Sequence, residues 1–182
     1  AVQNVLERAL AKVCGEQVEL AAAGRTDAGV HAYGQVVNFF TDGRIPVARL
    51  PRAVNGLLPP DIVVTEAWEA ARDFSARHSA TGKTYVYRIE QCTVPNPFTR
   101  SYVWQIFQPL DHDAMRAVLA LLVGTHDYSS FRAAGGAPMS PVRTLDEIRL
   151  TEEGAGRLSC HLHGNGFLYH MVRILAGTLL EI

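Results

Sequence analysis

The stretch from residue 24 to residue 34 carries the groups in this sequence that could do chemistry. Arg25, Thr26 and Asp27 place a cation, a hydroxyl and a carboxylate side by side. Three glycines surround them, and glycine permits tight turns and the close approach of another chain. This composition predicts an active-site loop. The structural alternative is that Asp27 caps a turn and Arg25 pairs with it. Residue types alone leave both interpretations open.

A second candidate is Arg173, which is the only charged residue between positions 158 and 180 when histidine is neutral. A guanidinium among apolar neighbours needs an acid or phosphate partner if it is buried, and an early helix turn gives it no help from the helix dipole. The alternative is an arginine whose aliphatic part packs while its charge reaches solvent.

Two further groups lie on predicted strands. Lys83, Tyr85 and Tyr87 share one face by the two-residue period of a strand, and the ordinary interpretation of such alternation is sheet packing. His161 and His163 also share a strand face, which could begin a metal site. No third ligand is apparent nearby in the sequence, so we expect no metal.

Secondary-structure patterns surround these candidates with short elements. In the first half we expect a helix over 1–14 ended by Gly15, strands at 17–22, 35–41 and 62–64, and a helix over 46–54. In the second half we expect a strand at 84–89, a helix from the Asp111 cap to about 122, strands at 142–150 and 157–163, and a helix from about 169 to the end. The loop at 24–34, which carries Asp27, would therefore lie between two strands.

Strands and helices mix in both halves without the regular alternation of a doubly wound parallel sheet. The pattern favours an α+β fold of two ferredoxin-like halves. We place the halves at 1–73, with the Asp27 loop, and 74–182, with Tyr85 and Arg173.

Composition bears on the partners of the protein and on whether it spans a membrane. Charges nearly cancel, at 17 basic and 18 acidic residues in a chain of 182. Fifteen of the basic residues are arginine, whose planar fork pairs with phosphate, so an RNA partner is compatible with the charge balance. The longest apolar run, 117–123, is far short of the roughly 20 residues that span a bilayer. We expect no membrane span.

The three cysteines, Cys14, Cys92 and Cys160, are dispersed and odd in number. Neither a disulfide framework nor a thiolate zinc site is indicated. The first residues lack the basic start and unbroken apolar stretch of a signal peptide. We therefore expect a cytoplasmic protein with reduced cysteines.

The loop at 24–31 resembles the catalytic loop of the TruA-type tRNA pseudouridine synthases, which isomerise uridines in the anticodon stem-loop of tRNA. Other blocks of that family match in the expected order, at 74–87, 124–132 and 167–173. The family's Tyr-Asp-Gly opening and its continuation past the final Glu-Ile are absent here, so we expect a chain trimmed at both ends. The resemblance implies the pseudouridine synthase fold, in which the antiparallel or mixed sheets of the two halves meet at a central cleft. It also implies a homodimer whose two subunits contribute to the RNA cleft.

The resemblance also implies roles for particular residues. Asp27 would be the nucleophile, Tyr85 would stack on the target base, and Arg173 would hold the Asp27 carboxylate. No cofactor or metal is implied. RNA contacts are implied for five residues of the matching blocks: Arg25, His31, Arg77, Lys83 and Arg132.

The implied reaction turns uridine into pseudouridine at tRNA positions 38 to 40. One rival hypothesis is a non-catalytic RNA-binding module on the same fold, which the strands and arginines would equally support. A weaker rival is a metal-dependent hydrolase built on His161 and His163. Asp27 in its full loop, together with Tyr85 and Arg173, favours the enzyme, because RNA binding alone would not require them.

Overall fold

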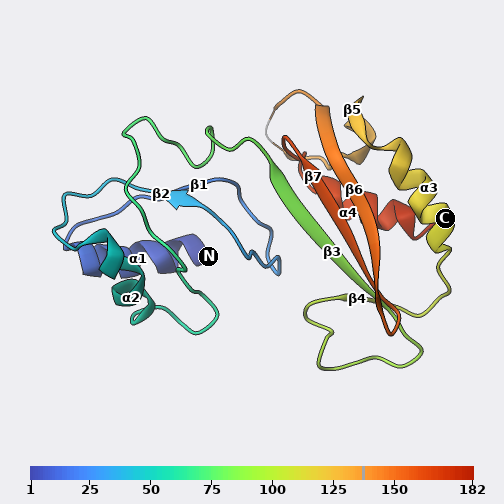
Figure 1. Ribbon diagram of the computed structural model, residues 1–182, viewed down its shortest axis with the longest axis horizontal. Helices are drawn as coiled ribbons and strands as arrows, with labels where there is room; N and C mark the ends of the chain where they lie inside the picture. Colours follow the sequence, from blue (N-terminus) through green and yellow to red (C-terminus); the bar gives the residue numbers. More distant parts are fainter. Residues whose placement is uncertain (137) are drawn as a thin grey trace. The chain divides into compact units, whose positions relative to one another are not determined.

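Residues 1–136 and 138–182 are described by a computed structural model (Figure 1). The chain forms two units, Ala1–Ala80 and Thr81–Ile182. Each unit has a hydrophobic core of its own. Both units mix helices with strands, which confirms the predicted α+β class. Among the described helices, none has the length and hydrophobicity needed to cross a bilayer.

Two helices pack against each other in the first unit. Helix α1 spans Val2–Cys14 and ends at Gly15, whose left-handed φ of 77° confirms the predicted stop. The predicted second helix begins as a 3-10 turn, η1 (Val47–Arg49), and continues as α2 (Leu50–Asn55). The core between them contains six buried residues: Ala9, Leu10, Val18, Leu20, Leu50 and Val54.

The sheet of the first unit is shorter than the sequence predicts. Strands β1 (Ala21–Ala22) and β2 (Val37–Asn38) pair antiparallel as the base of a hairpin. Val18 and Leu20 are buried as expected, but the backbone N–H of Leu20 donates to the side chain of Glu7 at 3.2 Å. A side chain thus takes the place of a strand partner, and the hydrogen-bonded ladder stops at Ala21.

The predicted strand at 62–64 is wrong for a related reason. The side chain of Asn55 pairs with the backbone of Val64 in both directions, accepting from its N–H at 2.8 Å and donating to its carbonyl at 2.9 Å. An amide side chain offers the same donor and acceptor as a peptide group. The segment is therefore held extended by one residue at the end of α2, and no described strand pairs with it.

The second unit is built on a five-stranded sheet in the order β4-β3-β7-β6-β5. Its strands are β3 (Lys83–Gln91), β4 (Trp104–Ile106), β5 (Gly124–Asp127), β6 (Val142–Gly154) and β7 (Arg157–Gly164). The pairing of β3 with β4 is parallel and the other three pairings are antiparallel. The three long strands match the sequence prediction, whereas β4 and β5 at the two edges were not predicted.

Helices α3 (His112–Leu121) and α4 (Met171–Leu179) cover one face of this sheet. Asp111 caps α3 as predicted, with its carboxylate accepting from two backbone N–H groups of the first turn. Helix α4 begins two residues after the predicted start near 169, because its N-cap residue His170 has a left-handed φ of 57° and so lies outside the helix.

The core of the second unit lies between the two helices and the sheet. Its buried members include Ile89 on β3, Leu162 on β7, Met115 on α3 and Leu175 on α4. Cys160 on β7 belongs to the same core, and burial raises the pKa of its thiol to about 11. Lys83, Tyr85 and Tyr87 lie on the same face of β3 as the core residue Ile89, because side chains two positions apart on a strand share a face. This face is turned towards the helices, and the alternate positions are turned away from them.

Candidate active site

The loop that carries Asp27 is the tip of the β1–β2 hairpin. The backbone N–H of Ala23 donates to the carbonyl of Val36 at 2.9 Å, which closes the loop at its base. The side chain of Gln35 donates to the carbonyl of Gly24 at 2.8 Å and adds a second tie. Eleven residues, 24–34, are thus held between fixed ends.

A tight turn sits next to Asp27 inside this loop. The N–H of Val30 donates to the carbonyl of Asp27 at 3.1 Å, and Gly29 adopts a left-handed φ of 81°. A turn with glycine at its third position and positive φ is typical of type II geometry. The side chain of Asp27 is half-buried, while those of Arg25 and His31 are exposed. The loop therefore fixes the backbone at Asp27, and the exposed Arg25 and His31 belong to the same loop.

The block that precedes the second unit is attached to the same hairpin. The N–H of Ala76 donates to the side chain of Asn38, on β2, at 2.8 Å. Ala76 is buried, and the neighbouring Arg77 is exposed. The first unit thus brings Asp27, Arg25, His31 and Arg77 onto one hairpin and its attached segment.

In the second unit Tyr85 projects from β3 and meets Phe167 edge to face, with the ring centres 4.9 Å apart. Its neighbour Tyr87 instead meets Trp104 on β4, with the ring centres 5.9 Å apart. Lys83, at the start of β3, is half-buried. The two tyrosines share a strand face but have different partners. The ring contact of Tyr85 joins β3 to the segment that leads into α4.

That segment also borders Arg173 and Arg132. The backbone carbonyl of Tyr169 accepts from the N–H of Ala133 at 3.1 Å, which ties the residues before α4 to those after η2 (Ser129–Phe131). Arg173 lies in the first turn of α4 and is exposed. Arg132 directly follows η2 and donates to the carbonyl of Met139 at 3.3 Å.

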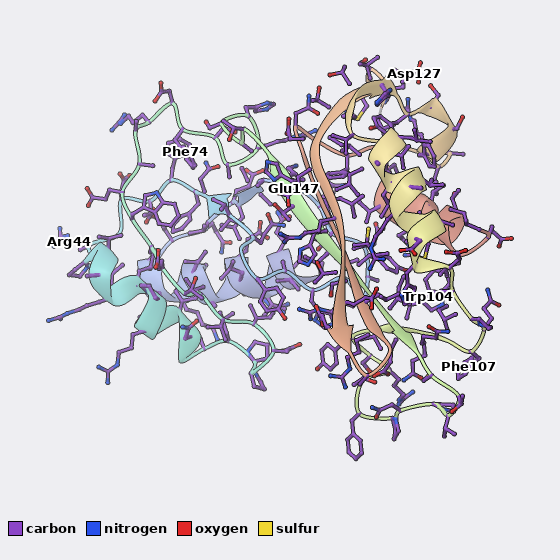
Figure 2. The ribbon with its side chains drawn as sticks, turned by 45° about the vertical axis from the view of Figure 1, so that its right-hand side comes forward. Arg44, Phe74, Trp104, Phe107, Asp127 and Glu147 are labelled. Atoms are coloured by element: carbon purple, nitrogen blue, oxygen red, sulfur yellow. The ribbon has the colours of Figure 1, made fainter. Side chains whose placement is uncertain are left out.

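The start of η2 is fixed by Asp127, which Figure 2 labels near the end of β5. Its carboxylate accepts from the hydroxyl of Ser129 at 2.5 Å and from the N–H of Ser129 at 2.8 Å. These bonds lower the pKa of Asp127, the hydroxyl contributing most. Asp127 is thus a turn residue that orients the approach to Arg132.

The structure therefore gathers the predicted residues in two sets, one in each unit. Asp27, Arg25, His31 and Arg77 belong to the first unit, and Tyr85, Lys83, Arg132 and Arg173 belong to the second. The predicted pairing of Asp27 with Arg173 joins the two sets and stays a prediction. The sequence analysis did not predict the contact between Phe167 and Tyr85. The available signal was an aromatic residue at the start of the 167–173 block.

His163, one of the two histidines of β7, has close neighbours on the adjacent strand and before it. Nδ1 of His163 lies 2.9 Å from the hydroxyl of Thr84, its neighbour on β3. Gly82 lies so close to this ring that an added Cβ would be 2.8 Å from it. Over residues 1–136 and 138–182, no three His, Cys, Asp or Glu side chains form a group that could hold a metal ion.

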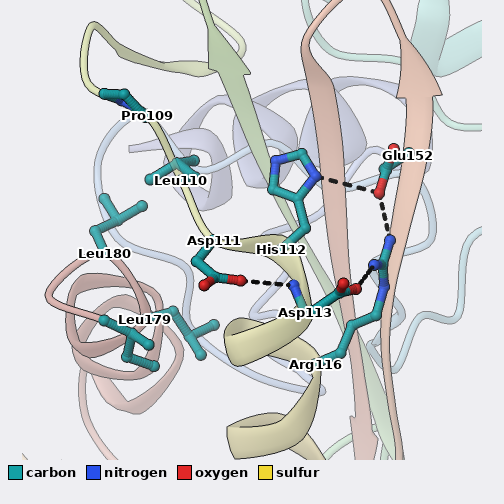
Figure 3. A pocket seen from close by; sticks show the side chains of 10 residues that line it. Pro109, Leu110, Asp111, His112, Asp113, Arg116, Glu152, Leu179 and Leu180 are labelled. Carbon is teal, nitrogen blue, oxygen red and sulfur yellow. Dashed lines mark hydrogen bonds and ion pairs between the residues drawn. The ribbon is translucent and has the colours of Figure 1, made fainter.

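A hollow of about 630 Å³ lies at the start of α3 and is shown in Figure 3. Glu152 accepts there from Arg116 and lies 3.2 Å from Nδ1 of His112. Its hydrogen bonds to these two groups, that to Arg116 first, lower the pKa of Glu152. None of the predicted site residues lines this hollow, so it is separate from the candidate active site.

Comparison with known proteins identifies the family. A family model described as tRNA pseudouridine synthase matches residues 1–79 and 118–182. The chain belongs to the tRNA pseudouridine synthase family. Membership confirms the resemblance carried by the 24–31 loop and places the α+β fold among pseudouridine synthases.

Individual members of the family match almost the whole chain. The tRNA pseudouridine synthase A of Moorella thermoacetica is 47% identical over 181 residues, covering 100% of this chain and 73% of that protein. The namesake from Thermoanaerobacter sp. (strain X514) is 44% identical over 178 residues, covering 98% and 72%. That from Latilactobacillus sakei is 46% identical over 183 residues, covering 100% and 74%.

Proposed function

We propose that this protein isomerises uridine to pseudouridine in tRNA, with Asp27 as the nucleophile. The observation that carries the proposal is the Asp27 hairpin loop, closed at its base and turned at Gly29, in a chain of this family. Relatives with 44 to 47% identity bear the name tRNA pseudouridine synthase A. A binding module would have no need of a half-buried carboxylate on a preorganised turn.

The reaction breaks the bond between uracil N1 and the anomeric carbon of ribose and forms a bond from that carbon to uracil C5. The C5 proton leaves to solvent and N1 gains a proton, so atoms balance without an oxidant or reductant. A carboxylate serves as a covalent nucleophile that splits a difficult step into two easier ones. Asp27 attacks either the sugar carbon or the base, and both routes give the same product.

Tyr85 and Arg173 complete the proposed machinery. The ring of Tyr85, packed against Phe167, would stack on a uracil that has left the helix, and its hydroxyl would help remove the C5 proton. Arg173 is exposed in the first turn of α4, and its guanidinium would pair with the Asp27 carboxylate. A planar fork would hold that carboxylate ionised and in one orientation.

The RNA backbone would meet the cationic residues of both units. Arg25, His31 and Arg77 would serve from the hairpin, with Lys83 and Arg132 in the second unit. The first unit adds three exposed arginines whose side chains make no ion pair within the described residues: Arg44, Arg49 and Arg52. Such side chains suit phosphate contacts. The target would be the anticodon stem-loop, and the working form a cytoplasmic homodimer.

The test is tritium release from tRNA labelled at uracil C5, because isomerisation frees that label and binding does not. The wild-type protein is expected to release tritium, and the Asp27→Asn variant is expected to bind tRNA within a few fold of wild type and to release none. Asp61→Asn, which removes an exposed acid from the same unit, is the matched control and should retain activity. Binding without release by the wild-type protein would favour the RNA-binding alternative, and release by Asp27→Asn would refute the nucleophile.

A further inference from the structure

Arg143 lies at the end of the second unit's sheet from which Lys83 and Tyr85 project. It is the second residue of β6, and Figure 1 shows the start of β6, the start of β3 and the end of β7 at the upper end of the sheet. Lys83 on β3 pairs with Gly164 on β7, which pairs in turn with Leu145 on β6. Paired positions share a face, and Arg143 shares the face of Leu145 by the two-residue period. Arg143 is therefore on the same face of the sheet as the candidate site residues.

The chain that follows β7 packs beside this arginine. Asn165 and Thr144 exchange two hydrogen bonds of 3.1 Å, in which Asn165 donates through its N–H and accepts through its side chain. A Cβ on the next residue, Gly166, would lie 3.7 Å from Nε of Arg143, which is an ordinary van der Waals distance. The segment after β7 is thus fixed against the start of β6, with the guanidinium of Arg143 beside it.

The protein itself uses only part of this guanidinium. Arg143 donates to the carbonyl of Val142 at 2.6 Å and to the thioether of Met139 at 3.0 Å. A thioether is a weak acceptor, and a guanidinium has five N–H groups to donate. Arg143 makes no ion pair within the part of the chain that the structure describes, and the carboxylate of Asp127 on the neighbouring β5 is already bound to Ser129. The charge of this half-buried side chain therefore has no anionic partner among the described residues.

A second guanidinium contacts the same methionine. Arg132 donates to the carbonyl of Met139 at 3.3 Å, so the two arginines reach Met139 at its backbone and at its side chain. Met139 is 45% exposed, so solvent reaches the place where the two arginines meet. The planar fork of a guanidinium matches the oxygens of a phosphate, and two neighbouring forks can share the oxygens of one phosphate. The two arginines therefore suit an anion with several oxygens.

The neighbours of the two arginines favour a phosphate of RNA. The segment that contains Gly166 continues into Phe167, whose ring meets that of Tyr85. In the proposed function Tyr85 stacks on the target uracil after the base has left its stack. A flipped nucleotide stays attached to the phosphates of its own backbone, and arginines close to the base pocket are placed to bind them.

We propose that Arg143, together with Arg132, binds a backbone phosphate of the tRNA next to the target uridine. The proposal rests on the proposed function for its ligand and adds Arg143 to the RNA contacts named there. A phosphate contact fixes the position of the RNA without reading its bases. Arg143 is thus a positioning residue, and its loss should raise KM and leave kcat nearly unchanged.

The salt dependence of tRNA binding tests this contact with two matched variants. Arg143→Gln removes the charge, and Arg149→Gln removes a charge from the opposite face of the same strand, where Arg149 pairs with Glu147 at 3.6 Å. Each phosphate contact that is lost lowers the slope of log Kd against log salt concentration by about 0.7 to 0.9. We expect Arg143→Gln to bind an unmodified tRNA transcript about 10-fold more weakly than wild type near 50 mM salt and about three- to fourfold more weakly near 200 mM. The Arg149→Gln control should match wild type at both concentrations.

A third variant, Arg143→Lys, separates the charge from the packing of the side chain. Lysine keeps the charge and loses the fork, so the salt slope should stay at the wild-type value while the affinity falls by only a few fold. Circular dichroism and the thermal midpoint should match wild type for all three variants. Removal of Arg143 leaves no acid unpaired, because this side chain makes no ion pair among the described residues.

Three results would overturn the phosphate contact. The first is an Arg143→Gln protein with wild-type affinity and slope. The second is a lower affinity at an unchanged slope, which would assign Arg143 to packing. The third is an Arg149→Gln control that is impaired as much as Arg143→Gln, because the overall charge of the protein would then account for the effect.

Tritium release on the same preparations keeps this proposal apart from the proposed function. If wild type binds tRNA and Arg143→Gln lowers the salt slope, but no preparation releases tritium, the proposed function is refuted and the phosphate contact stands. If Arg143→Gln releases tritium with the KM and salt slope of wild type, the phosphate contact is refuted and the proposed function stands.

Discussion

The turn beside Asp27 depends on one backbone angle, and replacing Gly29 by alanine tests it. Gly29 has a φ of 81°, in the left-handed region where an L-residue costs about 1 to 2 kcal/mol. A Cβ at this position would meet no atom within 4 Å, so alanine adds conformational strain without a clash. If the loop escapes that strain by leaving the turn, the population that presents Asp27 falls by about 5- to 30-fold.

The assay is tritium release under kcat/KM conditions, where a lower population of competent loop appears directly in the rate. We expect kcat/KM of Gly29→Ala to fall by about 5- to 30-fold, and that of Gly29→Asn to fall less, because asparagine tolerates the left-handed region better than alanine. The thermal midpoint should change little, since the turn is exposed and lies outside both cores.

Gly34 in the same loop supplies the control. It also has no atom within 4 Å of an added Cβ, but its φ lies outside the left-handed region. Gly34→Ala should therefore act within about twofold of wild type, because it adds the same methyl group without the strain. A Gly29→Ala protein as active as wild type, or a Gly34→Ala protein equally impaired, would refute the account of how the loop positions Asp27.

Four further results are expected. Tyr85→Phe should bind tRNA normally and release tritium more slowly, whereas Tyr87→Phe should release tritium at the wild-type rate. The reverse pattern would mean that Tyr87 is the active-site residue. Arg173→Lys keeps the charge but loses the fork, so activity should fall strongly at an unchanged circular dichroism spectrum; full activity would exclude a bidentate role. Tyr128→Phe should lower the free energy of unfolding by about 1 kcal/mol in urea titrations, because the hydroxyl of this buried side chain donates to a backbone carbonyl at 2.5 Å. Hydrogen bonds, that from Thr99 first, lower the pKa of Glu90, so its carboxylate stabilises the fold above its unfolded pKa, and this stabilisation is lost as the pH falls through the folded pKa. The free energy of unfolding of the Glu90→Gln variant should therefore depend less on pH in the acid range. An unchanged dependence would contradict this role of Glu90.

The sequence was most informative where an element carries its own signals. The alternation in β3 and the Asp111 cap of α3 are local patterns, and both elements formed as predicted. Residue types alone did not separate an active-site loop at 24–34 from an ordinary turn, because glycine and aspartate are common in both, and the choice came from the resemblance to the family's catalytic loop. Its position between two strands was predicted from the apolar segments on either side, and the antiparallel pairing of these strands came from the structure.

The failures have a common physical origin in backbone pairing. Leu20 and Val64 lie in apolar segments that resemble strands, yet their N–H groups are satisfied by the side chains of Glu7 and Asn55. A propensity pattern does not register a distant side chain that completes the hydrogen bonds of a peptide group. Strand β4 was missed because three residues are too few to show an alternating pattern. Its pairing with β3 is supported by the hydrogen bonds that Glu90 accepts from Thr99 and Gln105.

Because Cys160 is buried, the rate at which its thiol is labelled measures local opening of the second unit. Alkylating reagents react with the thiolate form of cysteine. With a pKa of about 11, the Cys160 thiol has almost no thiolate form at neutral pH, and it is only 2% exposed. Cys14 and Cys92 are half-buried and lie outside this core, so they should react first. Slow labelling of Cys160, resolved by mass spectrometry of its peptide, would then measure how often β7 separates from its neighbours in the native protein without any denaturant.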